Sequence, residues 1–185
     1  MRAKPQHDRI AHLSAAAMLA AITALLAQIA IPLGPVPLTL QTLAVLAAAC
    51  LFSPRWAAIA MSCYVGVGAV GLPVYSAGRA GFGYLLGPTG GFLFGFILGA
   101  LLGSWLLRRL PNRLSSNYLS ALAVVVVYDL CALPQMMLLM NIGLKEAAAL
   151  AILPVLPFDL LKVALFVPLL RRISAALHQQ FPLIY

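Results

Sequence analysis

The sequence has few charged residues, and acidic residues are the scarcest. Only 9% of the 185 residues are charged, and Asp and Glu together number 4. Soluble domains carry about 25% charged residues, so the chain lacks the polar surface that a water-soluble globule needs. The apolar fraction of 63% and the mean hydropathy of +1.02 indicate instead a surface that faces lipid.

Cysteine and histidine are also scarce, and their placement argues against a metal centre. Cys50, Cys63 and Cys131 stand alone in apolar stretches, without the paired spacing of metal ligands or of a disulfide framework. The 3 histidines lie near the two ends of the chain and form no cluster with Cys or a carboxylate. We therefore expect neither a metal site nor a cofactor.

Positive charge is in excess, with 12 Lys and Arg and a net charge of +8. No basic stripe with interleaved aromatic residues is present, as nucleic-acid-binding proteins have. The positive residues form short clusters between apolar runs, where they fix the orientation of a membrane protein. We expect a lipid bilayer as the surroundings and no nucleic acid as a partner.

Long apolar runs fill most of the chain. A membrane helix needs about 20 mostly apolar residues, and six runs approach or reach that length: 13–31, 39–52, 56–72, 88–107, 118–142 and 151–170. They predict an all-α integral membrane protein, one six-helix domain over residues 1–185. The first run is longer than the apolar core of a signal peptide, so we expect it to be retained.

Prolines and basic residues refine this prediction. Pro134 is expected to interrupt the fifth run, and the sixth should break at Pro154, Pro157 and Pro168. The basic clusters at the amino-terminal end, in the 2–3 and 4–5 loops and after the sixth run share one side of the membrane. The positive-inside rule therefore places both termini in the cytoplasm of a multi-pass protein of the cytoplasmic membrane.

Four glycines recur every four residues along the fourth run: Gly91, Gly95, Gly99 and Gly103. Glycines at this spacing allow another helix backbone to approach closely. We expect this stripe to pack against a neighbouring span of the same chain rather than at an oligomer interface.

Three ionisable residues lie within the apolar runs: Asp129, Asp159 and Lys162. Each costs about 2.5–3.5 kcal/mol at the centre of a membrane helix, so such residues usually face a cavity and have partners. Asp159 and Lys162 are three residues apart and share a helix face. A structural ion pair is the alternative, but buried pairs often add nothing to stability, which favours a ligand site. Asp129 is a further candidate for the ligand site, and it is either protonated or paired with Lys162.

Further polar features lie on the same, extracellular side. Pro157 predicts that the last helix starts near Asp159, below an irregular segment 154–158, which is consistent with a pocket that opens outward. The backbone amides of Gly90 and Gly91 begin the fourth helix and suit a carboxylate, unless this is an ordinary proline-initiated helix start. Arg79 is either a clamp for an anion or a solvated loop charge. Neutral hydrogen-bonding side chains complete the set: Thr39, Gln41 and Thr42.

Four segments carry a resemblance to a known family. They are residues 35–43 (PVPLTLQTL), 68–74 (GAVGLPV), 87–93 (GPTGGFL) and 157–162 (PFDLLK). In this order they resemble the BioY family, the biotin-specific substrate-binding subunits (S-components) of energy-coupling-factor transporters. The resemblance extends from residue 13 to residue 170. Two positions depart from it: Phe158 replaces the usual glycine before the acid, and Asp129 lies in a stretch that usually lacks an acid.

The resemblance implies a six-helix bacterial or archaeal membrane protein that binds biotin from the outside with high affinity. Its partners would be a transmembrane coupling protein and two ATPase subunits. The chain itself would not be an enzyme, in keeping with its lack of a phosphate-binding P-loop. By the resemblance, Asp159 and Lys162 are ligand contacts, and Arg79 lies where the family has a ligand-binding arginine. Ala17 and Ala21 match the small-residue motif that docks on the coupling protein.

The chemistry of biotin suits these side chains. Asp159 can accept hydrogen bonds from the ureido N–H groups, and Lys162 can donate to the ring carbonyl. Either Arg79 or the backbone amides of Gly90 and Gly91 could hold the ligand carboxylate. Aromatic side chains such as Tyr84 and Phe92 could cover the bicyclic ring.

Two other functions are weighed against biotin binding. The nearest is an S-component for another vitamin, such as thiamin or riboflavin. A more distant one is an intramembrane aspartyl protease with Asp129 and Asp159 as its dyad, because Tyr128-Asp129 resembles half of such a signature. The other half is missing, and Lys162 one turn away would keep Asp159 ionised, whereas a dyad must share one proton.

Overall fold

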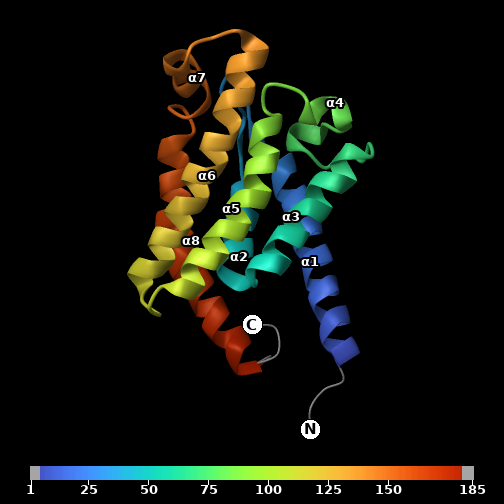
Figure 1. Cartoon of the computed structure of the whole chain (residues 1–185), viewed down its shortest axis with the longest axis vertical. Helices are drawn as coiled ribbons and strands as arrows, with labels where there is room; N and C mark the ends of the chain where they lie inside the picture. The colour runs from blue at the N-terminus through green and yellow to red at the C-terminus, as the bar shows by residue number, and fades with distance from the viewer. Residues whose placement is uncertain (1–4, 181–185) are drawn as a thin grey trace.

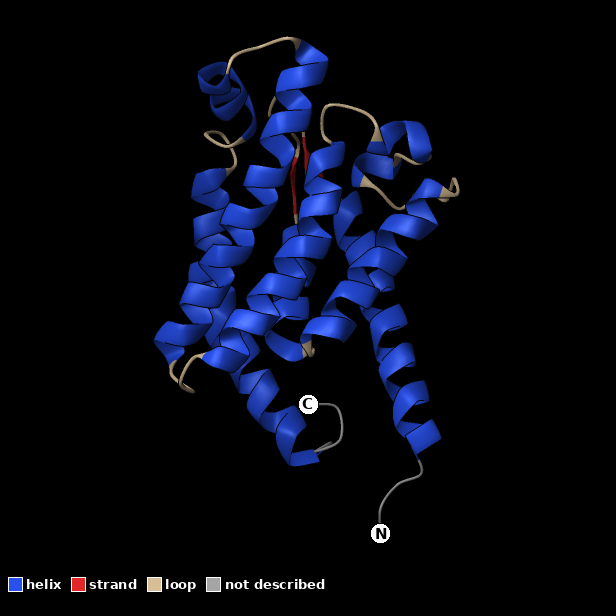
Figure 2. Ribbon diagram, in the orientation of Figure 1, coloured by secondary structure: helices blue, strands red, loops and turns tan. Residues whose placement is uncertain are grey.

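The computed structural model describes residues 5–180, with side chains from residue 9 to residue 176. Most of this part is helical, and Figure 2 shows only one short ribbon of strand among the helices. The elements are α1 (Pro5–Gln28), β1 (Ala30–Ile31), β2 (Leu38–Thr39), α2 (Gln41–Leu51), α3 (Pro54–Ala69), η1 (Ser76–Gly78), α4 (Phe82–Leu85), α5 (Gly90–Arg109), α6 (Leu114–Met140), α7 (Leu144–Ala151) and α8 (Leu156–Gln180).

The long helices surround the short helix α2. Helix α2 contacts α1, α3, α5, α6 and α8, and almost all of its residues are buried. At one end of the bundle lie the start of α1 and the end of α8, and at the other lie α4, α7 and the β ribbon (Figure 1). Helix α2 therefore forms the centre of the bundle, and the side chains of its first turn are buried inside the protein.

Three helices are long and apolar enough to cross a membrane: α1 over Arg9–Gln28, α5 and α6. The pair α7 and α8, bent by 50°, counts as a fourth candidate. Helices α2 and α3 hold 11 and 16 residues. At 1.5 Å per residue, α2 is only about 16 Å long, roughly half the thickness of the hydrocarbon core. By length and composition, three or four of the six expected spans are therefore evident in the described part of the chain.

Of the four expected proline breaks, only the one near Pro154 is confirmed, and those at Pro134, Pro157 and Pro168 are wrong. Helix α6 continues through Pro134, and α8 continues through Pro168. Neighbouring helices can compensate for the lost hydrogen bond, so membrane helices tolerate proline. The expected break near Pro154 does occur, since α7 ends at Ala151 and α8 begins at Leu156. Helix α8 thus begins before Asp159, with Pro157 in its first turn, where a missing N–H costs nothing.

The β ribbon and three short helices were not predicted from the sequence. Residues 31 and 39 were expected at span ends, but Ala30 pairs with Thr39 and Ile31 with Leu38 in antiparallel register. Gly34 has a φ of +92° in the connecting turn, a conformation that favours glycine. A strand of two residues is too short to show the alternation of apolar and polar residues that predicts a strand. The sequence around these residues therefore gave no sign of the ribbon.

The glycine stripe packs against α6 of the same chain, as predicted. A Cβ placed on Gly91 would lie 2.5 Å from the backbone oxygen of Cys131, and one on Gly95 would lie 2.5 Å from Cα of Tyr128. Gly99 and Gly103 approach Val124 in the same way. Because no side chains stand between them, the α5 and α6 backbones are in direct contact.

Candidate functional site

A buried ion pair lies between α2, α6 and α8. Asp159 is 3% exposed and Lys162 is 8% exposed. Lys162 Nζ is 2.8 Å from Asp159 Oδ1, and it also donates to Thr42 Oγ1 at 2.8 Å and to the Thr39 carbonyl at 2.7 Å. All three ammonium hydrogens therefore have acceptors, which a buried charge requires.

The carboxylate of Asp159 is held at both oxygens. Tyr128 donates its hydroxyl hydrogen to Oδ2 at 2.7 Å, and the Thr42 hydroxyl donates to Oδ1 at 3.3 Å. Together with Lys162 this makes three donors for a group with about four lone-pair sites. The carboxylate is thus fixed in orientation and can still accept one further hydrogen bond.

Local structure brings these groups together from distant parts of the sequence. The β ribbon folds the chain back so that the Thr39 carbonyl reaches Lys162, and Thr42 follows in the first turn of α2. Asp159 lies in the first turn of α8, where the helix dipole favours a negative charge. Tyr128 reaches Asp159 because α6 rests directly on Gly95.

A cavity of about 50 Å³ borders this ion pair. Two buried polar atoms from residues that line it, Gln41 Oε1 and Ser76 Oγ, have no hydrogen-bond partner. An unpaired buried polar atom costs about 1–3 kcal/mol, so these two leave part of the cavity wall with unsatisfied hydrogen-bonding capacity. The other lining residues are Val36, Pro37, Thr39, Thr42, Tyr84, Thr89, Phe92, Leu93, Phe96, Tyr128, Val155, Asp159 and Lys162.

Aromatic rings form much of the cavity wall. Phe96 meets Tyr128 edge to face with ring centroids 5.5 Å apart, and Tyr84 is stacked on Tyr75 at 5.2 Å. The guanidinium of Arg79 lies 5.7 Å from the centroid of Tyr84. Arg79 is exposed and does not line the cavity. Its guanidinium therefore lies at the edge of the cavity, next to the Tyr84 ring that forms part of the wall.

The structure brings six of the residues expected at the site to the cavity: Asp159, Lys162, Thr39, Gln41, Thr42 and Tyr84. Phe92, expected to cover a ligand ring, also lines it.

Besides Arg79, three expected residues do not line the cavity: Gly90, Gly91 and Asp129. The N–H of Gly90 donates to the Gly87 carbonyl at 3.0 Å, and Gly91 is packed against the α6 backbone. Asp129 is half-buried on α6, away from the cavity. Lys162 has Asp159 as its acidic partner, so the expected alternative of a pair with Asp129 is wrong.

Sequence reasoning missed the polar and aromatic cavity residues Ser76, Thr89, Phe96 and Tyr128, besides the aliphatic lining. Tyr128 had a signal, because a tyrosine hydroxyl in an apolar span needs a hydrogen-bond partner. Ser76 had none, since its segment reads as an ordinary polar loop. In the part of the chain that the structure describes, no group of three or more His, Cys, Asp or Glu could hold a metal ion.

Ala17 and Ala21 lie on the outer face of α1, where both are exposed. Ala16 and Ala20, one position earlier, are buried against the bundle. The exposed alanines therefore leave a shallow strip on the surface of α1 that is free of large side chains.

Comparisons with known proteins agree with one another. A sequence profile of the BioY family matches residues 1–179. A probable biotin transporter BioY of Pyrococcus horikoshii is 31% identical over 161 residues, which cover 87% of this chain and 94% of that protein. Biotin transporter BioY2 of Lactococcus lactis is 42% identical over 105 residues, 57% of this chain and 58% of that protein. A crystal structure of the S-component for biotin from an ECF-type ABC transporter superposes with a TM-score of 0.86, at 25% identity, and covers 94% of this chain and 95% of that one.

Proposed function

Because this chain belongs to the BioY family, we propose that it binds biotin and acts as the substrate-binding subunit of an ECF-type transporter. It is a transport protein and not an enzyme. ATP hydrolysis belongs to separate partner subunits. One observation carries the assignment: the buried Asp159–Lys162 pair borders a cavity that also holds unpaired polar atoms.

The hydrogen bonds already present support a proposal for the ligand contacts. Asp159 has room for one more donor, so it accepts from a ureido N–H of biotin. Gln41 and Ser76 supply the unpaired oxygens, which can accept from a second N–H, and their own hydrogens can be donated to the ligand. Lys162 has three acceptors already, so it reaches the ligand carbonyl only by releasing one of them, and its first role is to hold Asp159 ionised.

The carboxylate of biotin binds at the edge of the cavity. Arg79 is the better candidate than the amides of the α5 start, because the Gly90 N–H is already bonded to Gly87 and Arg79 lies beside Tyr84. The cavity of about 50 Å³ is smaller than usual ligand pockets of about 300–1,000 Å³. Biotin binding therefore requires the lining segments to move apart.

Charge and the arrangement of the helices support a proposal for the membrane topology. We propose six crossings in the cytoplasmic membrane, in which the short helices α2 and α3 count as spans within the bundle. The start of α1 and the end of α8 share one end with the basic loops, and that end is cytoplasmic by the positive-inside rule. The cavity, near the β ribbon at the other end, then faces outward.

The exposed strip of Ala17 and Ala21 on α1 supports the proposed partner contact. Small residues let a partner helix approach closely within a membrane. The partner would be the transmembrane coupling protein, which in turn binds two ATPase subunits.

Titration of the detergent-purified protein with labelled biotin tests the function. We expect saturable binding that unlabelled biotin displaces and that thiamin or riboflavin does not displace. Displacement by thiamin or riboflavin at lower concentration than by biotin would reassign the ligand. Cleavage of a peptide substrate that is lost on substitution of Asp129 and Asp159 would favour the protease.

Gln41→Met is expected to separate ligand binding from stability. The substitution removes a buried oxygen without a partner, so the melting temperature should stay the same or rise. The affinity for biotin should fall by about tenfold, the equivalent of one lost hydrogen bond. Tyr64→Phe is the matched control, because the Tyr64 hydroxyl is also buried and unpaired but lies away from the cavity. Equal affinities in both variants would remove Gln41 from the site.

Arg79→Gln is expected to weaken the binding of biotin but not of biotinamide, which lacks the carboxylate. A hydrogen bond to a charged group contributes about 1.5–3 kcal/mol, so the affinity for biotin should fall by roughly tenfold or more. The two ligands are compared by competition against labelled biotin. Equal losses for both ligands would show that Arg79 acts on the fold of its loop and not on the carboxylate.

A further inference from the structure

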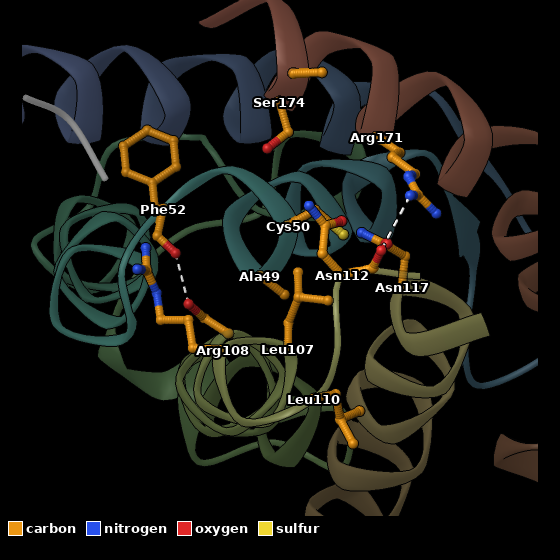
Figure 3. A pocket seen from close by; sticks show the side chains of 12 residues that line it. Ala49, Cys50, Phe52, Leu107, Arg108, Leu110, Asn112, Asn117, Arg171 and Ser174 are labelled. Carbon is orange, nitrogen blue, oxygen red and sulfur yellow. Dashed lines mark hydrogen bonds between the residues drawn. The ribbon is translucent and has the colours of Figure 1, made fainter. Parts of the chain in front are cut away.

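A second and larger cavity lies at the opposite end of the bundle. Its volume is about 500 Å³, and residues of α2, α5, α6 and α8 line it (Figure 3). It is near the carboxyl end of α5 and the second half of α8, the end that carries the start of α1 (Figure 1). None of its lining residues takes part in the buried ion pair, so the two cavities are separate.

The lining of this cavity is suited to an anion. Arg108 and Arg171 both contribute to it, together with the side chains of Asn112 and Asn117, and no acidic residue lines it. Arg171 donates to the backbone oxygen of Asn112 at 3.3 Å (Figure 3), which fixes the guanidinium on the α5–α6 loop. Asn117 is only 7% exposed. In Figure 3, Arg171, Asn112 and Asn117 lie together on one side of the cavity and Arg108 lies on the other. The guanidinium of Arg171 and a neighbouring amide can bind a phosphate group through charge-assisted hydrogen bonds, and Arg108 adds positive charge on the opposite side.

The depth of the cavity matches the headgroup layer of a bilayer. The chain has 2 tryptophans, and both are at this end, Trp56 at the start of α3 and Trp105 in the last part of α5. Tryptophans gather at the membrane–water interface. Apolar side chains such as Leu107 line the cavity beside the basic ones, and such a mixed lining fits a headgroup with the first part of its acyl chains.

We infer that this cavity binds the phosphate headgroup of an anionic lipid of the surrounding leaflet. Basic pockets between membrane helices on the cytoplasmic side take such headgroups. A soluble phosphate has the same charged group but no apolar part, so it makes no use of Leu107 and its neighbours. The inference requires that the chain spans a membrane and does not depend on biotin binding.

The test compares two double variants with the same change in net charge. Arg108→Gln with Arg171→Gln removes both cavity arginines. Arg109→Gln with Arg172→Gln removes their exposed sequence neighbours, which do not line the cavity. The full-length proteins in a neutral detergent are titrated with dioctanoyl phosphatidylglycerol, dioctanoyl phosphatidylcholine or inorganic phosphate, and binding is followed by native mass spectrometry. Elution as a single symmetric peak on size exclusion checks the fold.

We expect saturable binding of phosphatidylglycerol, about tenfold weaker in the first double variant and changed by less than twofold in the second. Equal losses in the two variants would show a general charge effect and overturn the site. Equal binding of phosphatidylcholine would also overturn it, as would inorganic phosphate alone binding as tightly as phosphatidylglycerol.

A second measurement uses the wild-type protein, so it holds even if the first double variant does not fold. Cys50 lines the cavity, whereas Cys63 is exposed elsewhere on the surface. Phosphatidylglycerol is expected to slow the alkylation of Cys50 by a maleimide severalfold, and to leave Cys63 unchanged, as read by peptide mass mapping. Unchanged alkylation of Cys50 at saturating lipid would place the lipid outside the cavity.

Discussion

Asp159→Asn is expected to abolish biotin binding, with a fall in affinity of at least about a hundredfold. Asparagine keeps the shape of the side chain but loses its charge, so a charge-assisted hydrogen bond to the ligand is replaced by a weaker one. It also leaves the Lys162 ammonium buried, with the Thr39 carbonyl and the Thr42 hydroxyl but no counter-charge. Removing one partner of a buried ion pair costs about 3–5 kcal/mol, so equilibrium binding and thermal unfolding are measured together.

Asp129→Asn is the matched control for this variant. It removes the other acid of the apolar spans, which is half-buried and does not line the cavity. We expect it to bind biotin like the wild type. A double variant, Asp159→Asn with Lys162→Met, removes both charges and should recover much of the lost stability while it still fails to bind. Recovery of binding in that double variant would show that the pair is structural and would remove the proposed site.

Gly95→Ala is expected to lower both stability and affinity. A Cβ at this position would lie 2.5 Å from Cα of Tyr128, and a backbone atom cannot yield as a flexible side chain can. Overpacking costs about 1–3 kcal/mol, which corresponds to a melting temperature lower by about 5 °C in a chain of this size. The Tyr128 hydroxyl, 2.7 Å from Asp159 Oδ2, would move away from the carboxylate, so biotin binding should weaken as well.

Gly66→Ala is the control for the glycine substitution. Gly66 is exposed on α3, and a Cβ there meets nothing within 4 Å. Because alanine favours a helix more than glycine does, this variant should be as stable as the wild type or slightly more stable. A fall in melting temperature of equal size in both variants would show that α5 and α6 are not held together at Gly95 in the way described.

The sequence was sufficient for features that depend on local chemistry. The apolar runs, the scarcity of acids and the glycine stripe predicted a helical membrane protein in which α5 packs on a span of its own chain, and the structure confirms that contact. The pair Asp159 and Lys162 was identified because two charges one turn apart in an apolar span require partners. The predicted ends and breaks of helices were less accurate. Helix α6 continues through Pro134, because neighbouring helices decide whether a proline interrupts a membrane helix.

Only the tertiary structure decided which atoms of distant residues contact the ion pair. Tyr128, Thr42 and the Thr39 carbonyl lie on other elements than the ion pair they hold, and Ser76 comes from a short helix that the sequence did not predict. The composition and periodicity of a segment predict whether it faces lipid, water or the protein interior, because this depends on the side chains of that segment alone. Which polar atoms remain unpaired, and where a cavity lies between them, depends on how the backbones approach one another, and no single segment contains that information.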